Sequence, residues 1–328
     1  MYQFIVGIDV SKEVIDVSFR LTSKVEYLGQ FKNDQVGFGR MIEDLKKSTF
    51  CAVSKGFICF ENTGVYSKLL LEYLIEKGVP CREENPIQIK RSMGLKRGKT
   101  DAIDSRSICI YAYEKRETLE HSKLTEPIIL KLKKLLSYRD LLVKQKVALQ
   151  ISIKESSPIL DDELKEFLVN QNTSLLTKYR EQIKAIELEV QKTIGQNTGL
   201  NRSYELVQSI KGIGPIIGAY LIAFTDNFRR FSNARKFACY CGIAPFPNQS
   251  GKFSGKTKVS HMANKKIKSL LSNAVPVAVR FDPQIKRYQE LKLKEGKPRG
   301  VIVNNIKNKL IQRVFAVINR QTHYVVLQ

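Results

Sequence analysis

The chain has 328 residues and is 43% hydrophobic, which is enough to bury the cores of two domains or of one domain with a long insertion. Its 55 lysines and arginines against 32 aspartates and glutamates give a net charge of +23, which favours nucleic acid as a partner, although a basic ribosome-associated protein would share it. No apolar run approaches the roughly 20 residues of a membrane span, which excludes a helical membrane protein.

The N-terminus and the cysteines indicate an ordinary intracellular chain. Residues 1–10 do not combine a basic start, a long apolar core and a small-residue cleavage site, so we expect a soluble protein that works in the cytoplasm. Of six cysteines only Cys239 and Cys241 are close, in a spacing unlike that of paired zinc knuckles. We therefore expect buried, reduced thiols.

The first third of the chain predicts an α/β domain. Apolar or alternating runs predict strands over residues 4–9, 14–20, 25–32, 57–61 and 79–83. Helical stripes predict helices over residues 36–47 and 66–77. Three strands followed by alternating helices and strands are the element order of an RNase H-like fold.

The next helix begins with two acids. Asp101 and Asp104 are three residues apart, so both carboxylates lie on one helical face. Directly before them is a basic run that we assign to nucleic-acid binding: Lys96, Arg97 and Lys99. A purely structural reading also exists, because Thr100 would cap this helix and the macrodipole favours acids in a first turn.

Two further acids end predicted strands. In an RNase H-like sheet, Asp9 and Glu61 converge with the start of the acidic helix, so we expect them to lie beside Asp101 and Asp104. Four clustered carboxylates repel one another unless a cation lies between them. Their natural use is to hold two Mg²⁺ or Mn²⁺ ions that polarise a phosphodiester. Taken singly, Asp9 is more simply a turn residue and Glu61 a surface acid; the set of four favours the metal site.

The middle of the chain predicts long helices. Leucines recur at helical spacing from about residue 124, Pro158 interrupts them, and the pattern resumes over residues 175–194. This indicates an antiparallel hairpin or coiled coil, either a dimerisation arm or an intramolecular bundle. Residues 195–201 predict a linker. Residues 206–224 predict two helices joined by a Gly-x-Gly turn. Either the backbone amides of this turn face a phosphate, or its glycines serve close helix packing.

The basic surplus is concentrated near the C-terminus. Residues 250–299 contain 13 lysines and arginines against three acids, and residues 241–256 predict a polar, glycine-rich loop. We expect nucleic-acid contacts from Lys252, Lys256, Lys258, Lys265, Lys266 and Lys268. On chemistry alone, Ser250 in such a loop is more simply a phosphate hydrogen-bond donor than a nucleophile.

Four motifs together resemble a known family. They are Gly-Ile-Asp-Val-Ser-Lys at 7–12, Phe-Glu-Asn-Thr-Gly at 60–64, Lys-Thr-Asp-Ala-Ile-Asp at 99–104, and the Ile-Lys-Gly-Ile-Gly-Pro to Gln-Ser-Gly-Lys series at 210–252. The combination resembles the DEDD transposases of bacterial insertion sequences of the IS110 type, which are RNA-guided recombinases. The resemblance spans nearly the whole chain and is specific only as a set.

The resemblance implies three domains. These are a RuvC-like catalytic domain over residues 1–118, a coiled-coil linker over 119–198 and a mainly helical transposase domain over 199–328. It implies that Asp9, Glu61, Asp101 and Asp104 bind Mg²⁺ and that Ser250 is the nucleophile, with Ser254 as an alternative. Ala263 stands where the family pattern has a glycine, so that turn is expected to differ.

The resemblance also implies partners. They are donor and target DNA, a structured guide RNA (the bridge RNA of the element) and further copies of the chain, as a dimer or tetramer with composite sites. In a bacterial cell such a protein would act at the nucleoid. Two rival hypotheses remain: a metal-dependent RuvC-like junction resolvase or nuclease that uses water, and a non-catalytic basic nucleic-acid-binding protein.

Overall fold

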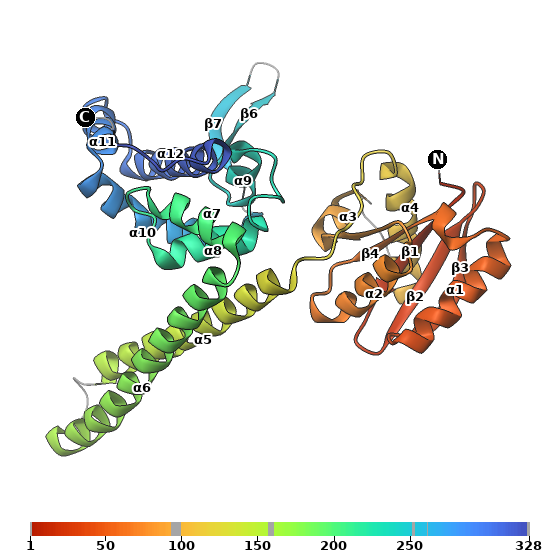
Figure 1. Cartoon of the computed structure of the whole chain (residues 1–328), viewed down its shortest axis with the longest axis horizontal. Helices are drawn as coiled ribbons and strands as arrows, with labels where there is room; N and C mark the ends of the chain where they lie inside the picture. The colour runs from red at the N-terminus through yellow and green to blue at the C-terminus, as the bar shows by residue number, and fades with distance from the viewer. Residues whose placement is uncertain (1, 93–99, 157–160, 251–252, 261, 327–328) are drawn as a thin grey trace. The chain divides into compact units, whose positions relative to one another are not determined.

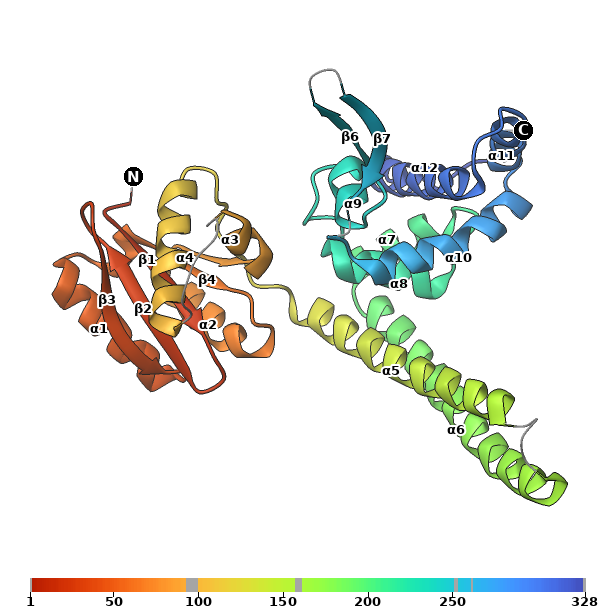
Figure 2. The same ribbon diagram turned by 180° about the vertical axis from the view of Figure 1, so that it is seen from behind.

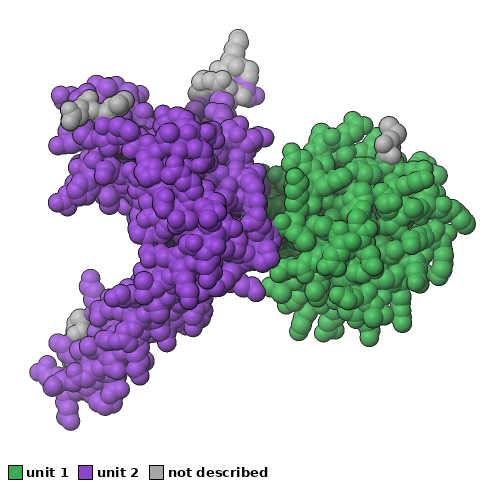
Figure 3. Space-filling view, in the orientation of Figure 1, with its two compact units in different colours: residues 1–124 green, residues 125–328 purple. Residues whose placement is uncertain are grey.

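The computed structural model describes residues 2–92, 100–156, 161–250, 253–260 and 262–326. It divides into two compact units, residues 1–124 and 125–328, coloured separately in Figure 3. Each unit has its own buried core and is described by itself. Among the described residues, no helix is both long and apolar enough to cross a lipid bilayer.

The first unit is built on one five-stranded sheet (Figure 1). Its strands are β1 (Phe4–Val10), β2 (Val14–Arg20), β3 (Val25–Lys32), β4 (Gly56–Glu61) and β5 (Cys81–Glu84). Their order is β3-β2-β1-β4-β5; β2 pairs antiparallel with both β3 and β1, β4 pairs parallel with β1, and β5 pairs parallel with β4. This is the RNase H-like arrangement that the element order predicts.

Helices cover both faces of this sheet. Helices α1 (Gln35–Thr49) and α2 (Val65–Glu76) pack on one face against alternate residues of β1 such as Val6 and Ile8. Helix α4 (Asp101–Lys115) and the short α3 (Pro86–Ser92) pack on the other face; Figure 2, turned by 180° from Figure 1, shows α4 in front of the strands. A 3-10 turn, Val53–Lys55, precedes β4. The mixed α/β character of the first unit is thereby confirmed.

The second unit is mainly helical. Its helices are α5 (Pro127–Ser156), α6 (Asp162–Gly195), α7 (Thr198–Gln208), α8 (Pro215–Thr225), α9 (Ala234–Tyr240), α10 (Lys265–Phe281), α11 (Pro283–Lys294) and α12 (Arg299–Arg320). Ion pairs Lys131–Glu189 and Arg139–Glu187 join α5 to α6 in antiparallel order. The base of this helical pair packs on α7 and α8 in one apolar cluster.

The structure corrects two predictions for this unit. The expected linker over residues 195–201 is much shorter, because α6 continues to Gly195 and Asn197 caps α7 at Leu200. The expected loop over residues 241–256 contains a β-hairpin, formed by β6 (Pro245–Ser250) and β7 (Phe253–Val259). Strand pairing satisfies the backbone of polar residues without any apolar alternation, and prolines are tolerated because both strands are edges.

Candidate metal centre and nucleic-acid interface

The candidate metal centre starts at the end of strand β1. Asp9 is the penultimate residue of β1 and is partly buried. Gly7, two residues earlier, faces α4 so closely that a Cβ there would overlap the backbone of Ser105 and Cys109. Because strand side chains alternate between faces, Asp9 points to the same face as Gly7. Asp9 therefore lies on the side of the sheet that α4 covers.

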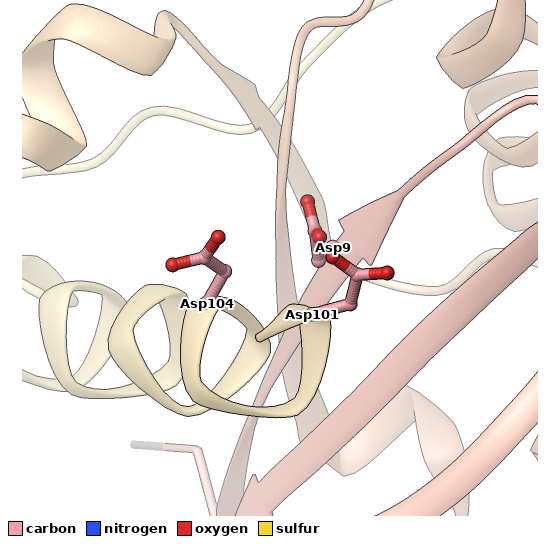
Figure 4. A group of neighbouring side chains, drawn as sticks. All are labelled: Asp9, Asp101 and Asp104. Atoms are coloured by element: carbon pink, nitrogen blue, oxygen red, sulfur yellow. The ribbon is translucent and has the colours of Figure 1, made fainter. Parts of the chain in front are cut away.

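The start of α4 supplies two more carboxylates. Asp101 and Asp104 lie in its first turn, after the cap in which Thr100 accepts a hydrogen bond from the Ile103 amide. Carboxylate oxygens of Asp9, Asp101 and Asp104 lie within 4.8 Å of one another (Figure 4). The structure thus brings together three of the four acids on which the sequence prediction depends.

Packing of α4 on the sheet fixes this geometry. The hydroxyls of Ser18 on β2 and Ser105 on α4 share a buried hydrogen bond of 2.8 Å. Ile108 and Ala112 of the same helix are buried against Phe57 of β4. Because these contacts hold the helix along its length, its first turn is held close to the end of β1.

The charge density of the site changes the acidity of Asp9. Burial, and then the charges of Glu61, Asp101, Asp104 and Asp16, raise the pKa of Asp9 to about 6. A carboxylate in such a place is costly to ionise unless a cation offsets the repulsion. Three carboxylates that converge from two elements provide the hard oxygen donors that Mg²⁺ and Mn²⁺ bind, so the residues fit a divalent cation.

Glu61 lies beside this group of three. The parallel pairing of β1 with β4 ends at Ile8 and Phe60, so Asp9 and Glu61 are the next residues along neighbouring strands. Glu61 makes the largest charge contribution to the raised pKa of Asp9. It is not one of the three residues whose oxygens lie within 4.8 Å of one another.

Sequence reasoning missed a buried acid next to the site. Asp16 on β2 is the direct cross-strand partner of Asp9 and is buried. It accepts hydrogen bonds from the Tyr27 hydroxyl at 2.6 Å and the Gln30 amide at 3.1 Å. Burial, and then the bond to Asp16, raise the pKa of Tyr27 to about 12, so its hydroxyl stays protonated and donates. The alternation of residues 14–20 favours a half-buried strand with Asp16 on its polar face, so the sequence held no signal for this burial.

The basic residues predicted to bind nucleic acid are only partly described. Lys96, Arg97, Lys99 and Lys252 lie outside the described residues, as do the side chains of Lys256 and Lys258. The other three, Lys265, Lys266 and Lys268, lie in the first turn of α10. Lys265 is exposed. Lys266 instead forms an ion pair with Asp140 of α5 and lies over the Tyr220 ring, so it also joins two helices.

The two candidate nucleophiles lie in the β6–β7 hairpin of the second unit. Ser250 is the last residue of β6, is exposed, and is paired in register with Phe253. Ser254 lies on β7 opposite Gln249, and its side chain is outside the described part of the structure. The acids belong to the first unit and both serines to the second.

Comparison with known families gives matches in both units. A family model for DEDD-type proteins, described as "Transposase", matches residues 6–157. A second, described as "Transposase IS116/IS110/IS902 family", matches residues 204–290. The two matches together cover well over half of the chain.

Individual relatives agree with these models. The chain is 25% identical over 327 residues to the pilin gene-inverting protein of Moraxella lacunata, covering 96% of this chain and 95% of that protein, with the same figures for the protein of that name from Moraxella bovis. It is 24% identical over 155 residues to an uncharacterized 42 kDa protein of insertion element IS900 from Mycobacterium paratuberculosis, covering 46% of this chain and 39% of that protein.

A solved structure is also similar in part. T. thermophilus RuvC in complex with Holliday junction substrate is 15% identical and covers 38% of this chain and 100% of that chain, with a TM-score of 0.27. A similarity of this size supports no argument about the activity of this chain.

Proposed function

Because the chain belongs to the IS116/IS110/IS902 family of transposases, we propose that it cuts DNA at chosen sites and rejoins the strands through a serine nucleophile. The observation that carries the proposal is the meeting of Asp9, Asp101 and Asp104 within a unit that the DEDD transposase model matches. Relatives of nearly equal length are named for inverting a gene, which agrees with paired cutting and rejoining.

The proposed metal ligands are the three clustered carboxylates and Glu61. Asp9 and Glu61 would hold the cation from the sheet, and Asp101 and Asp104 would hold it from α4. When bound, Mg²⁺ or Mn²⁺ supplies Lewis-acid stabilisation of the charge that develops on the phosphate. With a cation held by these acids, the scissile phosphate would lie close to the end of β1, which would restrict the orientation of the DNA strand.

The proposed nucleophile is Ser250. Its Oγ loses a proton and forms a bond to phosphorus while the bond to one sugar oxygen breaks, and that oxygen takes up a proton as it leaves. The phosphoserine link retains the energy of the phosphodiester, so a sugar hydroxyl of another strand can displace Ser250 and rejoin DNA without ATP. Exposure of Ser250 at the end of a hairpin suits attack on a large substrate.

We also propose a guide RNA and a composite site. If RNA pairing selects the sequence, the protein needs mainly backbone contacts, which agrees with a net charge of +23. Acids in one unit and the serine in the other allow one protomer's serine to act at a second protomer's carboxylates in a dimer or tetramer.

A second candidate function is metal-dependent hydrolysis. All three clustered carboxylates come from the first unit, so this unit alone has the ligands that a nuclease would use with water as the attacker. In that case the second unit would only bind nucleic acid, and free DNA ends would accumulate.

Analysis of reaction products separates the two functions. The purified chain would be incubated with the RNA encoded beside its gene, labelled donor and target DNA, and Mg²⁺. The proposal predicts joined donor–target strands that Ser250→Ala abolishes and that EDTA prevents. Hydrolysed ends without joined product, unaltered in Ser250→Ala, would support the nuclease instead.

A further inference from the structure

A row of polar side chains crosses all five strands of the first unit at the level of Asp9. On one side, Asp16 of β2 is the direct partner of Asp9, and Gln30 of β3 is the partner of Asp16. On the other side, Glu61 of β4 comes next to Asp9 and is paired with Glu84 of β5. The candidate metal centre therefore has a buried acid on each flank.

All members of this row face helix α4. Ser18, two residues beyond Asp16 on the same strand, bonds to Ser105 of α4, so Asp16 points to the same side. At the far end of the row, the Tyr111 hydroxyl of α4 donates to Glu84. The flanking acids thus lie on the face on which the three clustered carboxylates meet.

The two flanking acids are equally buried but differ in how their charges are compensated. Asp16 is 4% exposed and Glu84 is 7% exposed. Glu84 forms an ion pair with Arg82 at 3.2 Å. Asp16 instead accepts hydrogen bonds from the neutral donors Tyr27 and Gln30, and no cation of the described residues forms an ion pair with it. Among the described residues, the carboxylate of Asp16 is therefore compensated by neutral hydrogen-bond donors alone.

Directly opposed like charges on neighbouring strands destabilise a sheet. The Asp9–Asp16 pair therefore costs folding free energy in the absence of a cation, and a divalent cation at the neighbouring carboxylates removes that cost. We propose that Asp16 is a positioning residue of the metal centre, whose fixed charge strengthens cation binding through Asp9. This inference rests on the proposed function, since it needs a cation at Asp9, Asp101 and Asp104.

The hydrogen bonds of Asp16 explain why it acts through Asp9. Both of its oxygens accept donors from β3, at 2.6 Å from Tyr27 and 3.1 Å from Gln30. These bonds hold the carboxylate in one orientation and engage it away from the cation. Replacing an outer residue of a metal site typically changes metal affinity by about 10- to 100-fold, and we expect the lower end of this range for Asp16, which has no hydrogen bond to Asp9.

The test is a titration of purified protein with Mn²⁺, followed by electron paramagnetic resonance of the free ion. Asp16→Asn removes the charge and keeps the shape, because the Gln30 amide can turn its oxygen toward the new amide group. We expect the Mn²⁺ dissociation constant to rise by about tenfold. Saturating Mn²⁺ should restore DNA cleavage by Asp16→Asn, so the change is one of affinity rather than of the chemical step.

Glu84→Gln is the matched control. It removes an equally buried carboxylate from the same row, but one that Arg82 already neutralises. We expect its Mn²⁺ affinity to stay close to that of the wild type even though the protein loses stability. Asp16→Ser is the second test variant, in case Asp16→Asn does not fold: it also removes the charge, keeps a hydroxyl that can accept from Tyr27, and should weaken Mn²⁺ binding in the same direction.

The outcomes separate this inference from the proposed function. If wild type does not bind Mn²⁺, or if Asp101→Asn binds it as well as wild type does, the metal centre itself is wrong. If Asp101→Asn loses binding while Asp16→Asn and Asp16→Ser keep wild-type affinity, Asp16 has only a structural role and the inference fails. An equal loss in Asp16→Asn and Glu84→Gln would overturn it as well.

Discussion

Gly7 of β1 lies directly against the backbone of Cys109 of α4: a Cβ at residue 7 would overlap the Cys109 amide nitrogen. This contact lets α4 approach the sheet closely enough for Asp101 and Asp104 to reach Asp9. A glycine two residues before a strand-end acid therefore sets the geometry of the candidate metal centre. The requirement is for close approach of two backbones, since Gly7 is not among the glycines with positive φ.

Gly7→Ala should destabilise the first unit and impair the metal centre. The added methyl group meets backbone atoms that cannot rotate away, so α4 must shift, and such overpacking costs about 1–3 kcal/mol or more. Urea unfolding measures the change. Gly39→Ala is the control, because Gly39 lies inside α1 with only an ordinary contact nearby and should gain about 0.5–1 kcal/mol. Equal stabilities for the two variants would contradict this account of Gly7.

Asp101→Asn should abolish Mg²⁺-dependent strand cleavage while leaving nucleic-acid binding largely intact, because it removes one of three convergent ligands and no basic residue. Cleavage of labelled DNA over a range of Mg²⁺ concentrations measures the effect. The control is Glu114→Gln, which removes an exposed acid from the last turn of the same helix. Unchanged cleavage in Asp101→Asn would remove this residue from the metal centre.

The raised pKa of Asp9 predicts how the stability of the metal-free protein depends on pH. The folded state keeps a proton on Asp9 up to about pH 6, whereas the unfolded chain loses it near the ordinary aspartate pKa of 3.8. The contribution of Asp9 is therefore most favourable below about pH 4 and is lost as the pH rises through 6. Allowing for partial exposure, the loss amounts to about 1–2 kcal/mol.

Urea unfolding in EDTA at several pH values tests this sign. Between pH 4.5 and 7.5 the stability of wild type should fall relative to that of Asp9→Asn, which has no proton to lose. Added Mg²⁺ should stabilise wild type at pH 7.5 and have little effect on the variant. A constant difference between the two proteins across this pH range would contradict the assigned environment of Asp9.

Local patterns predicted the sheet well. Strands β2 and β3 begin and end at the predicted residues, because alternating side chains and flanking turns mark a strand directly. The half-buried character predicted for β2 is wrong, since both of its faces are buried. The β6–β7 hairpin was missed because polar strands of a two-stranded sheet carry no such alternation. Local propensity also could not show that α6 and α7 nearly meet, since packing on α8 overrides the helix-breaking residues between them.

In the candidate site, too, some features follow from local sequence pattern and others only from the tertiary structure. Asp9, Asp101 and Asp104 were predicted from their place in the element order, and the structure brings them together. The part played by Asp16 depends on strand register and on hydrogen bonds from β3, which no short motif contains. Neither its burial nor its position opposite Asp9 could be predicted, because the alternation of β2 places Asp16 on the polar face of the strand.

The two neighbouring lysines Lys265 and Lys266 should respond differently to replacement by alanine. Lys265 is exposed, so Lys265→Ala should weaken DNA binding and reduce the salt dependence of affinity by about one unit of slope. Lys266 pairs with Asp140, so Lys266→Ala should also cost about 1 kcal/mol of stability. Binding titrations at several salt concentrations, with urea unfolding, measure both. An affinity that does not change with salt would contradict the assignment of phosphate contacts.

The most direct test of the central claim is to look for DNA covalently attached to the protein. The chain, its flanking RNA and matching DNA would be incubated with Mg²⁺, resolved on a denaturing gel, and the modified residue identified by mass spectrometry. The account predicts an adduct on Ser250 that is absent from Ser250→Ala and retained in Ser254→Ala. Cleavage without any adduct, unaffected by Ser250→Ala, would contradict it and would mean that the carboxylates act with water alone.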